Sequence, residues 1–490
     1  MLQLFNNKAL NSNFMLQPFQ GQSVTLPGKQ VELSNWSKST RSACSVYPVN
    51  DLTGMLAALE AARAQGLSVI PHGAGHSYTD AALNTGGCVI DVTPMHRILS
   101  WDAQQGIMRV EPGVTLQELV QAAWKDGWWP VVSPSTARVT LGGCAAMNIN
   151  GRNAWKSGPF GATILSLEVL LASGELRTLA PEQEPQLFHA FVGSMGLLGI
   201  ITSISVQLQR LGSGLVTVRR RRAAAMDEIF DLLAEQEKNS DFMEAWLDGF
   251  ARGDQLGRGI VTSATLSPSG QADDAPFATF ANPGRLEESS VRSAARLARP
   301  MLLPAVQIAN RVNTWWGGGG QGKNGQLHGL VPFTFWPGAF FSGYPALLPQ
   351  GIETFQAFVP QQAAASMFKE VLRYTQQQGC MPLWCVIKKH RQDPFLLSYQ
   401  VDGFSLELNY ARAGQTAQQL QQTLQHMIAM VIAAGGRFYL AKDHFMTAAQ
   451  YRQSVGEQAV ETFLQFKQQF DPETRLQSDL FRRLFQPLCL

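Results

Sequence analysis

The sequence predicts an α+β protein of two domains, and three observations lead to this expectation. The chain has 490 residues, more than the ~250–300 at which a single hydrophobic core stops growing. Segments with helical and with strand periodicity are mixed, without a run of βαβ units. A short polar break at Leu211-Gly212-Ser213-Gly214 interrupts these patterns. We therefore place a domain boundary at residue 212.

The elements of the N-terminal part follow from spacing and capping. Leu52, Met55, Leu56 and Leu59 have helical spacing, which predicts a helix over 51–65 with Asn50 or Asp51 as its cap. A second helix is expected over 115–126 with Thr115 as its cap, and a third over 226–236 beyond the break. Strand patterns occur at 67–70, 87–91, 106–110 and 164–171.

A glycine-rich loop follows the first of these strands. Residues 71–78 read Pro-His-Gly-Ala-Gly-His-Ser-Tyr. Glycines leave backbone N–H groups uncovered, and such groups form a concavity that binds anions. The dinucleotide fingerprint G-x-G-x-x-G needs a third glycine where Tyr78 stands, so a doubly wound fold is disfavoured. The loop alone indicates either a cofactor diphosphate site or a tight turn.

A second segment raises the case for a cofactor. Residues 133–153 and 156–161 carry small side chains, hydroxyl groups and paired glycines, with little charge and no clear periodicity. This composition suits backbone packed closely against a large flat ligand that needs hydrogen-bond donors. One large cofactor could span both segments.

Four stretches together resemble the FAD domain of the vanillyl-alcohol-oxidase superfamily, and especially its branch of decaprenylphosphoryl-ribose 2′-oxidases. They are residues 71–77, residues 110–115, the pair Gly142-Gly143, and residues 193–201. The resemblance implies a two-domain PCMH-type FAD-binding fold whose substrate domain is an antiparallel sheet flanked by helices. The implied division is an FAD domain over 1–212, a substrate domain over 213–436, and a segment over 437–490 that returns to the FAD domain.

The resemblance also implies which residues contact FAD. They lie in the glycine-rich loop, in the second segment and after the Gly193-to-Gly199 stretch. The expected contacts are Pro71, Gly73, Ala74, Gly75, His76, Ser77, Pro134, Ser135, Thr136, Thr140, Gly142, Gly143, Ala146, Ile149, Asn150, Gly151, Asn153, Gly158, Ile200, Ile201 and Lys442.

The C-terminal half carries the expected catalytic residues. Residues 355–360, 383–388, 404–410 and 435–443 are similar to substrate-facing segments of that branch, and Gln356, Lys388 and Lys442 keep its residues. Oxidation of a secondary alcohol moves a hydride to flavin N5 while the hydroxyl proton leaves, so basic or cationic groups belong beside the reacting oxygen. We expect Lys442 at the flavin–substrate junction and Lys388 and Gln356 on the sugar oxygens.

Further site residues follow from the same comparison, together with three departures from it. Tyr78 and Glu407 join the expected catalytic set, and Trp246 and Ser405 the substrate contacts. Glu407 stands where the branch has cysteine, Ser405 where it has asparagine, and Asn150 where it has histidine. Glu407 could act as a base if burial raised its pKa. The substrate could therefore differ from that of the branch.

His76 leaves two interpretations of the cofactor open. The branch has arginine at this position and binds FAD without a covalent bond, whereas sugar-alcohol and aldonolactone oxidases of the superfamily carry a flavin-linked histidine in the same motif. Those oxidases end in His-Trp-Gly-Lys, but this chain has Leu440-Ala441-Lys442-Asp443. FAD is expected in either case, and attachment through His76 is a hypothesis. A His72–His76 metal site is not expected, because the loop lacks helical geometry.

Three functions remain open on this basis. The first is oxidation of a secondary hydroxyl of a pentose-like sugar to a ketone, with a polyprenyl-phosphate-linked sugar as one option and a separate reductase completing an epimerisation. The second is a free-sugar, alditol or aldonolactone oxidase with covalent FAD that releases hydrogen peroxide. The third is a flavin-fold protein that has lost catalysis and serves as a binding partner.

The region 268–329 reads as a flexible insertion rich in Gly, Ala, Pro and Arg. Residues 317–324 imitate a phosphate loop, but Asn324 stands where a hydroxyl must meet magnesium. Arg292, Arg296 and Arg299, followed by the apolar residues 301–306, fit either peripheral contact with anionic lipid or packing on the domain itself. Arg219 to Arg222 would point to alternating faces of a strand, as a solvated end or as an anionic-substrate rim.

Net charge, cysteine spacing and hydropathy limit the classes of partner and the compartment that the sequence predicts. The formal net charge of +2 gives no excess of positive charge of the kind that binds nucleic acid. The six cysteines lack C-x-x-C spacing, so the sequence predicts neither a zinc site nor a disulfide framework. No apolar stretch reaches the ~18 residues needed to span a bilayer, and the first residues lack a signal-peptide core. A cytoplasmic enzyme is expected, with a place at the inner face of the membrane as an option.

Overall fold

The first sheet and its helix begin the FAD half of the chain. The computed structural model describes residues 28–268, 302–316, 325–341, 348, 350–412 and 417–488. Strands β1 and β2 are antiparallel, whereas β4 is parallel to both β2 and β3, in the order β1-β2-β4-β3. Asp51 caps α1 by accepting from the Gly54 N–H at 2.8 Å, which confirms the predicted helix. The elements are β1 (Lys29–Ser34), β2 (Arg41–Pro48), α1 (Leu52–Ala64), β3 (Val69–His72) and β4 (Cys88–Asp91).

The second sheet completes the FAD half. Its path is β5-β6-β10-β8-β9, with β7 paired to β10. Thr115 and Glu118 form a reciprocal capping box at the start of α2, so the predicted cap is confirmed. The elements are β5 (Ile98–Asp102), β6 (Ile107–Val110), α2 (Leu116–Trp124), β7 (Trp128–Pro130), α3 (Leu141–Ala146), α4 (Ala154–Ser157), η1 (Phe160–Thr163), β8 (Ile164–Leu170), β9 (Leu176–Leu179), α5 (Pro185–Phe191) and β10 (Ile200–Arg210).

The third sheet is antiparallel, and in the described part of the chain it has eight strands in the order β14-β11-β13-β12-β16-β17-β15-β18. Helices α6, α11 and α12 pack on it. The elements are β11 (Leu215–Ala223), α6 (Met226–Gln236), η2 (Glu237–Asn239), β12 (Phe242–Leu247), η3 (Gly253–Gln255), β13 (Gly259–Leu266), α8 (Leu302–Trp316), β14 (Gln326–Gly329), α9 (Leu330–Phe341), β15 (Ile352–Pro360), α11 (Gln361–Gln377), β16 (Trp384–His390), β17 (Gly403–Ala411), α12 (Ala417–Ala433) and β18 (Arg437–Phe438).

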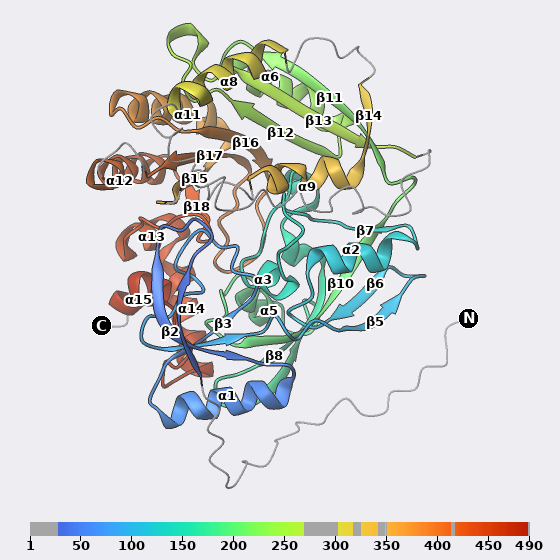
Figure 1. Cartoon of the computed structure of the whole chain (residues 1–490), viewed down its shortest axis with the longest axis vertical. Helices are drawn as coiled ribbons and strands as arrows, with labels where there is room; N and C mark the ends of the chain where they lie inside the picture. The colour runs from blue at the N-terminus through green and yellow to red at the C-terminus, as the bar shows by residue number, and fades with distance from the viewer. Residues whose placement is uncertain are drawn as a thin grey trace, which may run out of the picture.

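The C-terminal helices return to the first sheet. They are α13 (Ala448–Val455), α14 (Glu457–Phe470), α15 (Asp479–Leu484) and η6 (Gln486–Leu488). Leu476 bridges to Val69 of β3, and the Asp479 N–H donates to the Leu83 carbonyl. Figure 1 shows these helices beside β2 and β3, with the third sheet above them.

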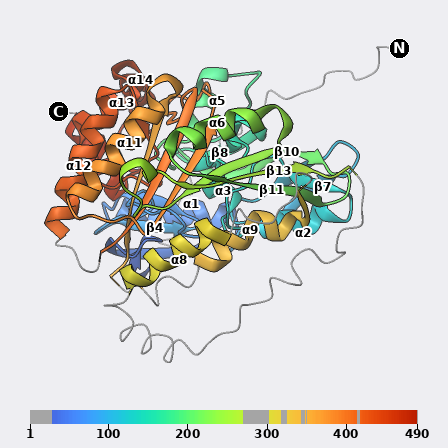
Figure 2. The same ribbon diagram turned by 90° about the horizontal axis from the view of Figure 1, so that it is seen from above.

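Seen from above, α11 to α14 lie along one side of the molecule, and α8 and α9 along another (Figure 2). The division into 1–212, 213–436 and 437–490 stays a prediction. The third sheet begins at Leu215, and β18 (Arg437–Phe438) still belongs to it, since it pairs with β15. The return toward the FAD half therefore starts after Phe438.

The region predicted as a flexible insertion contains ordered elements. Helix α8 occupies 302–316, and β14 pairs with β11 as an edge strand of the third sheet. The imitated phosphate loop at 317–324 and Arg292, Arg296 and Arg299 lie outside the described residues. Within the described ranges, none of the helices combines the length and the apolar character needed to cross a bilayer.

Candidate active site

A cavity of about 1090 Å³ separates the loops of the FAD half from the third sheet. Single-ligand pockets commonly enclose ~300–1,000 Å³, so this space suits a large cofactor and a second ligand beside it. Most of the residues expected from the sequence line it. They are Pro71, Gly73, Ala74, Gly75, His76, Ser77, Tyr78, Pro134, Ser135, Thr136, Thr140, Gly142, Gly143, Ala146, Ile149, Asn150, Ile201, Trp246, Gln356, Lys388, Glu407 and Lys442.

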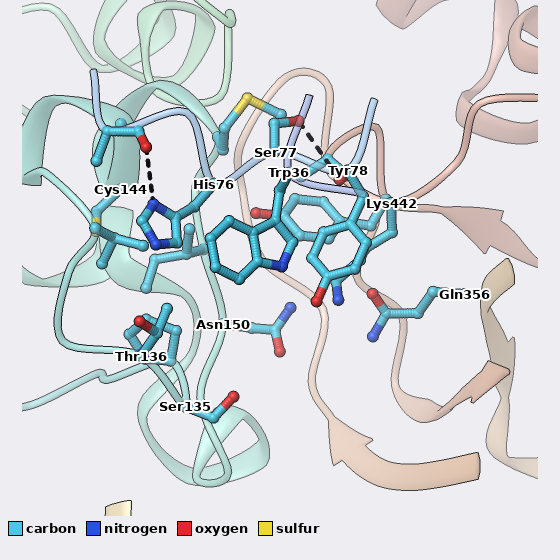
Figure 3. Close-up of a pocket in the computed structure, with 18 of the residues that line it drawn as sticks. Trp36, His76, Ser77, Tyr78, Ser135, Thr136, Cys144, Asn150, Gln356 and Lys442 are labelled. Atoms are coloured by element: carbon cyan, nitrogen blue, oxygen red, sulfur yellow. Dashed lines mark hydrogen bonds between the residues drawn. The ribbon is translucent and has the colours of Figure 1, made fainter. Parts of the chain in front are cut away.

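The two glycine-rich segments meet at this cavity, where Gly73 lies against the Thr140 side chain. A Cβ at Gly73 would lie 2.2 Å from Thr140 Oγ1, so a larger residue there would force the two segments apart. A Cβ at Gly142 would lie 2.9 Å from the Pro112 carbonyl oxygen, so this glycine lets the second segment approach the backbone at Pro112. Figure 3 shows Ser135, Thr136 and Asn150 across the space from His76. This surface of backbone, hydroxyl and amide groups fits an extended FAD.

His76 presents a nitrogen to which the protein supplies no hydrogen bond. Its Nδ1 lies 3.0 Å from the Ala74 carbonyl, which accepts the Nδ1 hydrogen and leaves a lone pair on Nε2. Nε2 is buried without a partner, and the Trp36 indole stacks on the ring at 4.5 Å (Figure 3). Burial lowers the pKa of His76, against the Ala74 hydrogen bond. A neutral imidazole with an unused acceptor at the cavity fits contact with the expected cofactor.

The floor of the cavity is set by strand register. In one cross-strand row Trp246 is opposite Val386, Val386 opposite Glu407, and Glu407 opposite Gln356. Directly opposite side chains on one face of a sheet lie ~4.5–5.5 Å apart. Four strands therefore bring a tryptophan, a carboxylate and an amide onto one surface. The Gln356 Oε1 is buried and has no hydrogen-bond partner, so it is available to a ligand hydroxyl.

Lys442 reaches this row from the segment that follows β18. Its Nζ donates to Glu407 Oε1 at 3.1 Å and lies 3.5 Å from the centre of the Tyr78 ring. Figure 3 shows Lys442 beside Tyr78 and facing Gln356. Burial alone would lower the pKa of Lys442, but the Glu407 charge and Tyr78 hold it above its usual value. Lys442 is therefore a fixed cation at the cavity wall.

The surroundings of Glu407 decide whether it could act as a base. Burial alone would raise its pKa, but the charges of Lys442 and Lys388 and a hydrogen bond from Asn409 hold it below its usual value. The condition for a base, a pKa raised by burial, is therefore not met, because two lysines converge on Glu407 from β16 and from the segment after β18. Glu407 is an ionised carboxylate that fixes Lys442.

Lys388 differs from Lys442 in its electrostatics. Burial lowers its pKa, and the nearby Lys442 and Arg152 charges act in the same direction, against Glu407 and Glu244. A buried lysine with a lowered pKa is closer to the uncharged amine that can accept a proton. Of the two lysines at the floor, Lys388 is therefore the better base.

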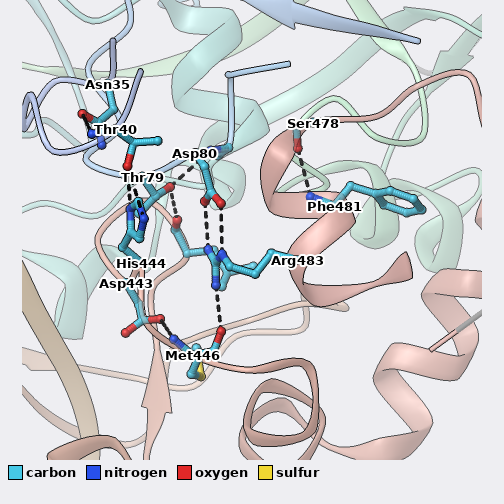
Figure 4. A network of polar contacts seen from close by, with 12 residues as sticks. Asn35, Thr40, Thr79, Asp80, Asp443, His444, Met446, Ser478, Phe481 and Arg483 are labelled. Atoms are coloured by element: carbon cyan, nitrogen blue, oxygen red, sulfur yellow. Dashed lines mark hydrogen bonds and ion pairs between the residues drawn. The ribbon is translucent and has the colours of Figure 1, made fainter. Parts of the chain in front are cut away.

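A network behind the floor holds the Lys442 segment against the loop after β3 (Figure 4). Arg483 of α15 donates to both carboxylate oxygens of Asp80, at 2.9 and 2.8 Å, and to the Met446 carbonyl at 2.8 Å. The Thr79 hydroxyl donates to the Leu440 carbonyl at 2.7 Å. These contacts fix the chain before Lys442, at Leu440, and after it, at Met446, to the loop after β3 and to α15.

Five expected site residues do not line the cavity. Gly151 faces Asn153. The Asn153 amide donates to the Val131 carbonyl at 2.7 Å, so this side chain holds the backbone and does not face the cavity. Gly158 has a positive φ of 74° and ends α4 beside Arg391. Ile200 is buried in the core of the first sheet, on the face of β10 opposite Ile201. Ser405 is buried against His390, with Oγ 2.8 Å from Nε2.

Several cavity residues were missed from the sequence. Trp36 lies in the turn between β1 and β2, and its position depends on tertiary folding alone. Arg152 forms an ion pair with Glu244 at 3.0 Å, and α8 contributes Asn310 and Asn313. Of the arginine run, only Arg220 lines the cavity; Arg221 pairs with Glu235. Arg220 is thus the member of the run to which the predicted alternation of strand faces gives a place at the cavity.

Comparison with known proteins agrees with this geometry. Residues 48–180 match the model of the FAD binding domain family. The chain is 28% identical to the decaprenylphosphoryl-beta-D-ribose oxidase of Mycolicibacterium smegmatis over 475 residues, covering 94% of this chain and 99% of that protein. It is 31% identical to a D-lactate dehydrogenase of Anaerostipes hadrus over 148 residues, 29% of this chain and 31% of that one. Cytokinin dehydrogenase 10 of Oryza sativa subsp. japonica is 31% identical over 152 residues, 29% of this chain and 27% of that one.

Proposed function

We propose that this chain, a member of the vanillyl-alcohol-oxidase superfamily and an FAD-dependent oxidoreductase acting on CH–OH groups, oxidises a secondary hydroxyl of a pentose-like sugar to a ketone. The observation that carries the proposal is the convergence of Lys442, Glu407, Lys388 and Gln356 on one floor of the cavity. FAD, when bound, supplies the acceptor for the hydride.

The protein groups divide the remaining work. Lys388, with its lowered pKa, accepts the hydroxyl proton as the C–H bond breaks. Lys442 stays protonated and supplies positive charge at the cavity wall. The Gln356 Oε1 accepts a hydrogen bond from a second hydroxyl, and Trp246 offers a flat apolar face to the sugar ring. Together these groups suit a polyol better than a simple alcohol.

The charges that line the cavity favour a substrate with an anionic group. With Lys388 as the neutral amine, Arg152, Arg220 and Lys442 are three cations against the two carboxylates of Glu244 and Glu407, an excess of one that becomes two when Lys388 accepts the proton. None of the basic residues comes from the glycine-rich loop. This balance supports a phosphate-linked sugar, and a phosphodiester to a polyprenyl chain is one form of it.

An apolar arm of the cavity supports the polyprenyl form. Leu348 and Leu383 are buried in a cluster that also receives Trp36, Tyr78, Val306 and Trp384, all of which line the cavity. This arm runs from the Lys442 end, at Tyr78, toward α8. A hydrocarbon chain attached through phosphate would be buried along it at a gain of roughly 0.8 kcal/mol per CH₂ group.

The outer face of α8 supports a place at a lipid surface. Ile308 and Val312 are exposed on α8. We predict that Ile308→Glu with Val312→Glu lowers binding of the holoenzyme to anionic phosphatidylglycerol vesicles by roughly tenfold or more, measured by co-sedimentation. The control, Ile98→Glu with Leu99→Glu on β5, removes two other exposed apolar residues, 38% and 42% exposed, and should leave binding unchanged. Equal losses in both variants would contradict this contact.

A partner reductase completes the proposed reaction sequence. The M. smegmatis relative is named an oxidase of decaprenylphosphoryl-β-D-ribose. A ketone at a ring carbon loses that carbon's configuration, so hydride return from the other face gives the epimer. The class of enzyme that consumes the product is therefore a ketose reductase.

A panel experiment tests the function. Oxidised holoenzyme is mixed anaerobically with a short-chain prenylphosphoryl-ribose, ribose 5-phosphate, free pentoses and alditols, and flavin absorbance is followed. We expect reduction by the phosphate-linked sugars and ketone formation. Reduction by free sugars or alditols with hydrogen peroxide released in air would favour the second candidate, a free-sugar oxidase. No reduction by any of them would overturn both and favour a non-catalytic role.

The unpartnered Nε2 of His76 favours the second candidate, the oxidase with covalent FAD, as an alternative. We propose covalent attachment of FAD through the unpartnered Nε2 of His76. Acid precipitation of the wild-type protein should then leave the flavin in the pellet, whereas His76→Ala should release it to the supernatant, as shown by absorbance. The control His426→Ala removes a histidine of α12 that does not line the cavity and should retain the flavin. Flavin released from the wild type would mean noncovalent binding.

A further inference from the structure

We propose that Ser405, His390 and Gln400 form a buried hydrogen-bond chain that orients the amine of Lys388 toward the cavity. They are positioning residues, since they do not line the cavity. The inference rests on the proposed role of Lys388 as proton acceptor. It also gives Ser405, expected at the substrate, a different place in the site.

Strand register places the chain beside Lys388. Lys388 of β16 is directly opposite Ser405 of β17, and His390 lies two residues along β16 on the same face. Opposite side chains lie ~4.5–5.5 Å apart at Cβ. The Ser405 Oγ is 2.8 Å from His390 Nε2, and His390 Nδ1 is 3.3 Å from Gln400 Oε1. Ser405 is 1%, His390 2% and Gln400 0% exposed, so water does not compete for these bonds.

The chain has a direction. With its Oε1 toward His390, Gln400 accepts from Nδ1, which places the hydrogen of the neutral imidazole on Nδ1, while the Gln400 Nε2 is buried without a partner. His390 Nε2 is then an acceptor and must take the Ser405 hydroxyl hydrogen. In the proposed orientation a remaining lone pair of Ser405 Oγ would accept an N–H from Lys388, the residue directly opposite it in the strand register. An amine that donates to Ser405 keeps its own lone pair for the cavity.

The charges near Lys388 and His390 show whether the chain only orients Lys388 or also holds the proton that leaves the substrate. Lys388 is faced by Glu407 on β17, Glu244 on β12, Arg152 beyond α3 and Lys442 after β18. Burial, and after it the Lys388 charge, lowers the pKa of His390 to about 3. At pH 7 only about one His390 in 10⁴ would carry a second proton. The proton from the substrate therefore does not rest on His390, and the chain orients Lys388 without relaying through it.

Replacement of His390 separates this role from simple packing. His390→Phe fills the space but accepts no hydrogen bond, so the Ser405 hydroxyl can turn and donate to the Lys388 lone pair. His390→Gln keeps an acceptor at a similar reach. The readout is the rate of anaerobic flavin reduction by a short-chain prenylphosphoryl-ribose from pH 5 to 10, with flavin content and thermal melting measured alongside.

We expect His390→Phe to lower the plateau rate by roughly tenfold to a hundredfold, as for a misplaced reacting group, and His390→Gln to restore it to within about twofold. His426→Phe, a matched control on α12, should change neither rate nor profile. Equal plateau rates and profiles for the Phe variant, the Gln variant and the wild type would overturn the inference, as would losses in both variants that follow flavin content.

A second measurement does not depend on turnover. In ¹⁵N-histidine-labelled holoenzyme, the signal that disappears in His390→Gln should be a neutral Nδ1–H imidazole that does not titrate between pH 5 and 9, and Ser405→Ala should shift its Nε2 resonance. A His390 that titrates near pH 6.5 would overturn the chain. If no sugar reduces the wild type, the proposed function fails, and this measurement alone reports whether the chain exists.

Discussion

Replacing Lys442 with methionine is expected to slow anaerobic flavin reduction by the substrate by roughly 10²- to 10⁴-fold. Lys442 is a half-buried ammonium held by Glu407 at 3.1 Å and by the Tyr78 ring, with its pKa raised by the Glu407 charge against burial. Its loss removes the fixed positive charge of the cavity wall. Stopped-flow absorbance with a short-chain prenylphosphoryl-ribose measures the effect.

The single change also leaves Glu407 as a buried charge with one cation fewer, which by itself destabilises a protein by roughly 3–5 kcal/mol. The double variant Lys442→Met with Glu407→Gln removes both charges and should melt nearer the wild type while remaining slow. Lys389→Met is the matched control, because Lys389 neighbours Lys388 but pairs with Glu237 away from the cavity. A double variant that keeps its flavin and reacts within tenfold of wild type would contradict the role of Lys442.

The second large effect is expected at the Asp80–Arg483 pair. Asp80→Asn should lower the free energy of unfolding by roughly 3–5 kcal/mol, because it leaves a largely buried guanidinium without its carboxylate. It should also slow flavin reduction, since Arg483 and Asp80 clamp the segment that carries Lys442. Denaturant unfolding of holoenzyme measures the first, and stopped-flow the second. Arg41→Gln, at an exposed pair with Glu32, should cost at most about 0.5 kcal/mol.

The same pair predicts a pH dependence with a definite sign. Burial alone would raise the pKa of Asp80, but the hydrogen bonds and charge of Arg483 hold it below its usual value of 3.8. The folded state therefore binds the Asp80 proton less readily, so the stabilisation is present above pH 3.8 and is lost as the pH falls through the folded pKa. The difference in stability between wild type and Asp80→Asn should be constant above about pH 5 and shrink below about pH 4. A difference that grows on acidification would contradict it.

Local chemistry made much of the fold predictable. Asp51 and Thr115 cap the helices assigned to them, and the predicted third helix coincides with α6. The glycine-rich loop and the second segment line one cavity, and Gly73 leaves room for the Thr140 side chain of the second segment. The resemblance to the vanillyl-alcohol-oxidase superfamily and the expectation of FAD are confirmed.

The remaining features depend on tertiary packing. The sign of the Glu407 pKa shift follows from two lysines that meet it across strands, which no local pattern encodes. Trp36 and α8 reach the cavity from segments without a motif. Ser405 shares a face of β17 with Glu407, but His390 holds it away from the cavity. Strand alternation predicts which face a side chain takes, and neighbouring side chains decide whether a ligand can reach it.

The most direct test of the central claim is an anaerobic titration of the oxidised holoenzyme with a short-chain prenylphosphoryl-ribose, with product analysis. We expect complete bleaching of the flavin at one equivalent of sugar, one equivalent of ketone, and no bleaching on the same timescale in Lys442→Met with Glu407→Gln. A fully flavin-loaded wild-type protein that stays oxidised with this sugar, with ribose 5-phosphate and with every free sugar tried would contradict it.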